Sequence, residues 1–79
     1  MIDLVVPPLG ANGAQEITIS AWLVGIGEEV IEGDRIVELL LGEITFDVSS
    51  LTNGRLVQIL VEVDERVFPG TVLGKILPE

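Results

Sequence analysis

Apolar residues in this chain come in short runs, which turn-forming residues interrupt every few positions. Val, Ile and Thr fill 24 of the 79 positions, and Gly, Pro, Asn or Asp breaks the runs too often for a long helix. The pattern therefore predicts an all-β fold. The predicted strands are residues 2–6, 16–24, 35–41, 44–48, 55–63 and 72–77, with shorter extended pieces near Val30 and Val67.

The chain repeats itself after 37 residues, so that segment 22–27 aligns with segment 59–64. The alignment continues without a gap and places Gly33 on Gly70. A chance match of aliphatic strands is the alternative, and the joint match of these two turn glycines argues against it. Two copies of one supersecondary unit are therefore predicted.

Two copies cannot form a solenoid, because a repeat array usually needs at least three units to bury a continuous core. They can form a sandwich in which each half contributes short strands and the halves bury their apolar faces against each other. The expected fold is a flattened barrel-sandwich hybrid of two pseudo-twofold-related halves. Residues 1–79 are expected to make one domain.

A tight hairpin is predicted between the strands 35–41 and 44–48, which only Gly42 and Glu43 separate. Glycine followed by another residue suits a type II′ turn, because the first turn position needs a positive φ. Gly42 is thus expected in the turn and Glu43 at its exposed tip.

The net charge is strongly negative, since 13 acidic residues against 4 basic ones give a formal charge of -9. Nucleic acid and anionic lipid headgroups repel such a chain, and its basic residues are too scattered to suggest a local patch. No apolar run approaches the length of a spanning helix, and the residues after Met1 are not expected to form a signal peptide. Together with the lack of cysteine, these features favour a cytoplasmic protein that binds neither nucleic acid nor membrane.

Residues that carry chemistry are scarce. The sequence has no His and no Cys, so neither a nucleophile beside a base nor a transition-metal site can be assembled, and catalysis is not expected. Carboxylates in the repeated turns suggest a metal site, but they lack the spacing of a calcium loop, which favours solvated acidic turns. Trp22 suggests a docking residue, but its place opposite Ile59 in the repeat favours a partly buried position at the core.

Four stretches that span nearly the whole chain form a series of motifs. They are Pro7-Pro8-Leu9-Gly10, the segment 17–24, the glycine-acidic-valine turn 27–34 and the second half from Gly54 to Gly70. In order and spacing they resemble the lipoyl domain of 2-oxo acid dehydrogenase acyltransferases. The resemblance implies the flattened β-sandwich. One extra residue between Gly10 and Trp22 departs from the family and is harmless to the fold.

The decisive departure from that family lies at the hairpin tip. The family carries an acidic residue followed by the lysine that receives lipoate, and the resemblance puts Gly42 and Glu43 at these positions. A glutamate cannot form that amide. Lys75, the only lysine, lies in the predicted last strand without a turn to present it. No lipoate is therefore expected on this sequence, although lipoate is the family's cofactor.

Three functions stay open. The first is a lipoyl-like domain of a dihydrolipoamide acyltransferase or a related protein, in which the carrier role is lost and a structural or docking module remains. The second is an acyl-carrier domain with a substituted tip. The third is a barrel-sandwich segment of a membrane-fusion adaptor, although those adaptors usually insert a helical hairpin where this chain has only residues 51–54. The resemblance implies subunits of a dehydrogenase complex as partners.

Overall fold

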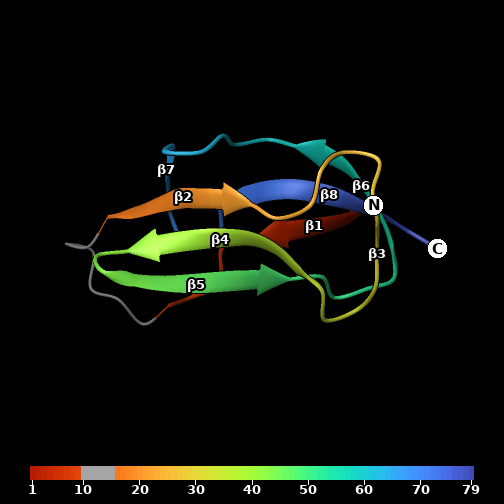
Figure 1. Ribbon diagram of the computed structural model, residues 1–79, viewed down its shortest axis with the longest axis horizontal. Helices are drawn as coiled ribbons and strands as arrows, with labels where there is room; N and C mark the ends of the chain where they lie inside the picture. Colours follow the sequence, from red (N-terminus) through yellow and green to blue (C-terminus); the bar gives the residue numbers. More distant parts are fainter. Residues whose placement is uncertain (10–15) are drawn as a thin grey trace.

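The computed structural model describes residues 1–9 and 16–79, and within them every regular element is a strand (Figure 1). The all-β prediction is confirmed. The eight strands are β1 Ile2–Val5, β2 Ile17–Trp22, β3 Glu29–Val30, β4 Arg35–Leu41, β5 Ile44–Ser49, β6 Gly54–Ile59, β7 Arg66–Val67 and β8 Val72–Pro78. Within the same residues no helix is long and apolar enough to cross a membrane.

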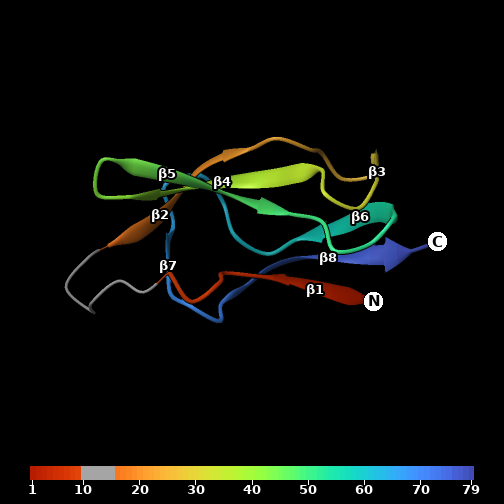
Figure 2. The ribbon, with the colours of Figure 1, turned by 90° about the horizontal axis from the view of Figure 1, so that it is seen from below.

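The strands form two antiparallel sheets of four, in the orders β1-β8-β6-β3 and β5-β4-β2-β7. Figure 2 shows the sheets as two layers, one holding β4 and β5 and the other β1 and β8. The domain is elongated, with principal extents of 38 × 20 × 17 Å. The predicted flattened sandwich is confirmed.

The two halves are related by the predicted repeat. The unit β2-β3-β4 returns as β6-β7-β8 with every strand boundary shifted by 37 residues. Hydrogen bonds repeat as well: Leu23 N donates to Ile36 O at 2.8 Å, and Leu60 N donates to Leu73 O at 2.9 Å. Each unit sends its short middle strand to the other unit's sheet, so that β3 pairs with β6 and β7 pairs with β2. This exchange ties the halves together.

Two of the strands are shorter than predicted. The strand expected over 16–24 ends at Trp22, and the one expected over 55–63 ends at Ile59. After these points the chain must leave its sheet to reach the opposite one, and it does so through turns such as the one in which Glu65 N donates to Glu62 O. Apolar residues therefore continue past the strand ends without belonging to a strand.

The core between the sheets is aliphatic, since the sequence has only one Trp and two Phe and no Tyr. Trp22 lies at its edge, partly buried, and its indole nitrogen donates to the carbonyl oxygen of Val61 at 3.0 Å, which confirms the expected core position. Burying each of the larger side chains contributes about 1.5–3 kcal/mol. The buried hydrophobic residues are Leu4, Val6, Ile17, Ile19, Val30, Ile36, Val37, Leu39, Leu41, Val48, Leu56, Val61, Val67, Leu73 and Ile76.

Candidate functional site

The hairpin between β4 and β5 is built as the sequence predicted. Leu41 pairs with Ile44, and only Gly42 and Glu43 lie between them. Gly42 has a φ of 62°, whereas Glu43 is not among the described residues with positive φ, which is the sign pattern of a type II′ turn. Glycine is needed at the first position because a Cβ is disfavoured there.

The turn lies at one end of the long axis. In Figure 1 the β4–β5 tip is at the left, and both chain termini are at the right. The side chain of Glu43 is exposed. Residues 10–15, which include part of the stretch in which an extra residue is expected, lie outside the described residues.

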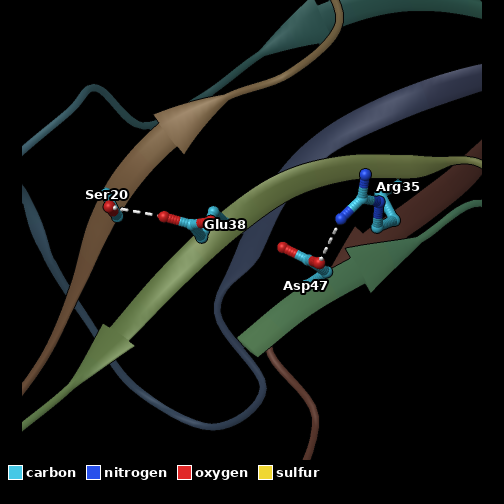
Figure 3. Close-up of polar contacts among 4 residues, drawn as sticks. All are labelled: Ser20, Arg35, Glu38 and Asp47. Carbon is cyan, nitrogen blue, oxygen red and sulfur yellow. Dashed lines mark hydrogen bonds and ion pairs between the residues drawn. The ribbon is translucent and has the colours of Figure 1, made fainter. Parts of the chain in front are cut away.

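Core packing and two polar contacts position the arms of the hairpin. Leu39 and Leu41 of β4 are 0% and 6% exposed and anchor this strand on its inner face. On the sheet, Ser20 Oγ donates to Glu38 Oε1 at 2.9 Å and Arg35 donates to Asp47 Oδ2 at 3.3 Å (Figure 3). The Arg35 side chain is 70% exposed, so its ion pair adds little stability. Packing therefore dominates the support of the tip.

A shallow hollow lies beside the tip on the outer face of the sheet. Glu16, Thr18, Leu40 and Gly42 line it. Sequence patterns did not identify this hollow, because the pairing of β2 with β4 brings together residues that are more than 20 positions apart.

Lys75 lies far from a turn. It occupies the middle of β8, where its Cα partners are Asp3 in β1 and Gln58 in β6. Its ammonium is 3.4 Å from the Asp3 carboxylate, and its side chain is 33% exposed. The prediction that this lysine lies within the last strand is confirmed.

Carboxylates of the repeated turns bind their own backbone. Glu28 accepts a hydrogen bond from Gly25 N at 3.1 Å, and Asp34 accepts one from Ile31 N at 3.0 Å. In the second half, Glu65 accepts one from Glu62 N at 3.4 Å. Across residues 1–9 and 16–79, no three His, Cys, Asp or Glu side chains gather into a possible metal site. The carboxylates of these turns therefore have a structural role, because they hold the backbone of their own turn.

Comparisons with known proteins place this geometry in context. The model of the Biotin_lipoyl family, described as biotin-requiring enzyme, matches residues 3–76. Among solved structures, the chain is similar to the lipoyl domain of the 2-oxoglutarate dehydrogenase complex from Azotobacter vinelandii. The two share 23% sequence identity with a TM-score of 0.78, over 98% of this chain and 96% of that one. A comparison with curated proteins gave no match.

Proposed function

This chain belongs to the Biotin_lipoyl family. We propose that it is a lipoyl-like domain of an acyltransferase component of a 2-oxo acid dehydrogenase complex, in which Glu43 takes the place of the family's modified lysine. On this proposal it does not carry an acyl group and acts as a structural or docking module. The observation that carries the proposal is the two-residue tip, with Gly42 at a φ of 62° and Glu43 exposed beyond it. A family carrier would present its lysine at such a tip.

The side chains present do not fit the attachment of lipoate or biotin. Each of these acids is joined through its carboxyl group to a lysine amine, and the carboxylate of Glu43 offers no amine to acylate. Lys75 is held between two strands and paired with Asp3. The proposal therefore assigns no cofactor to this chain.

A role without catalysis follows from the same composition. The chain has no His and no Cys, so the usual sets of nucleophile and general base cannot be built. Its expected partners are protein subunits of the complex, since a net charge of -9 disfavours nucleic acid and anionic membrane.

Two alternative functions stand beside this proposal. A carrier with a substituted tip would regain its function with a lysine at position 43. The membrane-fusion adaptor is disfavoured by the connection between β5 and β6, which runs only from Ser50 to Asn53. It is folded on itself, because Ser50 Oγ donates to Thr52 O at 2.6 Å.

The test is lipoylation followed by mass spectrometry. The wild type, Glu43→Lys and Glu32→Lys are each co-expressed with a lipoate ligase and lipoate. We expect no mass increase on the wild type and at least partial modification of Glu43→Lys, because ligases are expected to recognise a lysine by its place on the turn. Glu32→Lys puts a lysine on another exposed turn and should stay unmodified.

Two outcomes would contradict the proposal. A lipoyl group on Lys75 of the wild type would make the domain a carrier as it stands. Modification of Glu32→Lys with none on Glu43→Lys would show that position 43 is not the family's attachment point.

A further inference from the structure

Sheet pairing places apolar and charged side chains beside the hairpin tip. Leu40 in β4 pairs with Thr18 in β2, and Thr18 pairs with Arg66 in β7. These three alternate with buried residues, so they share the outer face of the sheet. Phe68 follows Arg66 by two positions, and the Arg66 guanidinium lies 5.3 Å from the centre of its ring. We name as the tip face the residues Glu16, Thr18, Leu40, Arg66 and Phe68.

The tip face is hollowed and apolar at its margins. The hollow lined by Glu16, Thr18, Leu40 and Gly42 lies within it. Leu40 is 36% exposed and Phe68 is 57% exposed. Neighbouring strands are about 4.8 Å apart. Because β2 lies between β4 and β7, the strands of Leu40 and Arg66 are about 10 Å apart, which leaves room for one or two side chains of a partner.

The charge around the tip face is negative. Arg66 contributes its only positive charge and is already held by Glu16, with Nε 3.7 Å from Oε1. The exposed carboxylates of Glu43, Asp64 and Glu65 add to the negative charge at this end. The last two lie beside β2, because Asp64 N donates to Ile19 O and Ile19 N donates to Glu65 O.

We propose that the tip face docks a segment of a partner protein that carries basic side chains next to apolar ones. This inference rests on the proposed docking role and assigns a surface to it. Leu40 and Phe68 would cover the partner's apolar side chains, while the exposed Glu43 beside them pairs with a basic group of the partner. A second copy of this chain does not fit, because its charge of -9 has the same sign.

The pseudo-twofold supplies a matched control. Ile31 stands 37 positions before Phe68, in the corresponding turn of the first half, and is 62% exposed. It follows β3, which Figure 1 places at the end of the domain that carries the termini. Replacing Ile31 therefore removes an exposed apolar side chain from the equivalent turn, far from the tip, although Ile31 lacks the aromatic contact that Phe68 makes with Arg66.

The experiment is an NMR titration of the ¹⁵N-labelled domain with a short amidated peptide that carries lysines beside two leucines. We expect saturable shifts of the Thr18, Leu40 and Phe68 amides. Phe68→Ser should weaken binding about tenfold, while Ile31→Ser leaves it unchanged. A peptide with glutamates in place of the lysines should not bind, and one with serines in place of the leucines should bind weakly and lose its binding in salt.

The proposal is overturned if Ile31→Ser and Phe68→Ser weaken binding equally, or if the shifts spread evenly over all acidic turns. Either result would mean attraction by net charge alone. A second variant, Leu40→Ser, must weaken binding as Phe68→Ser does, and its amide spectrum checks that the fold is kept. Lipoylation of the wild type would refute the proposed function. A positive titration would still support this docking surface, so the two failures can be told apart.

Discussion

Replacing Gly54 with alanine should destabilise the domain through a clash with the backbone of the neighbouring strand. Gly54 begins β6, is buried, and pairs with Pro78 in β8. A methyl group at position 54 would overlap the carbonyl oxygen of Leu77. It would also lie 2.9 Å from the carbonyl carbon of Leu77 and 3.0 Å from Ile76 Cγ2. The backbone oxygen cannot rotate aside, so β6 and β8 would have to separate.

The magnitude follows from two opposing effects. Alanine reduces the freedom of the unfolded chain, which stabilises by about 0.4–1 kcal/mol. Overpacking against a fixed neighbour costs about 1–3 kcal/mol. With backbone as the neighbour we expect the upper part of that range, and so a net loss of about 2 kcal/mol. For a domain of this size, with a stability of roughly 4–12 kcal/mol, that loss is large.

Urea denaturation measures this effect. With an m-value of about 1 kcal/mol/M, the midpoint of Gly54→Ala should fall by about 2 M. The matched control is Gly25→Ala, whose methyl group would meet only the flexible end of Glu28, at 3.3 Å. Its free energy of unfolding should change by less than about 0.5 kcal/mol. Equal midpoints for the two variants would refute the argument that Gly54 is required by the spacing of β6 and β8.

Two further substitutions probe the hairpin and the edge of the core. Gly42→Val puts a β-branched residue at a φ of 62° and should lower the free energy of unfolding by about 1 kcal/mol or more, whereas unchanged thermal unfolding would mean that the turn does not need glycine. Trp22→Phe keeps an aromatic ring but leaves the Val61 carbonyl without its indole donor. Urea denaturation should therefore show a free energy of unfolding lower by about 1–2 kcal/mol, and an unchanged value would mean that this hydrogen bond adds no net stability.

Glu43 at the hairpin tip could be anticipated because its determinants are local. Two strands separated by two residues can only be joined by a tight turn, and glycine at the first position selects the turn type. The conformation of Gly42 therefore follows from a stretch of about ten residues. The tip face has no such local signal, since Thr18, Leu40 and Arg66 meet only through the pairing of three strands.

The sequence by itself determined the all-β class, the aliphatic core and the duplication, because alternation, β-branched residues and turn glycines act over neighbouring positions. Only the tertiary structure decided that β3 and β7 cross to the opposite sheets, since two residues are too few to carry a pattern of their own. It also decided where the halves differ. Gly54 and Ile17 hold equivalent positions, and of these two residues Gly54 is the one that lies against a backbone with no room for a side chain. Distances between strands are set by the packing of the whole core, and no local pattern encodes them.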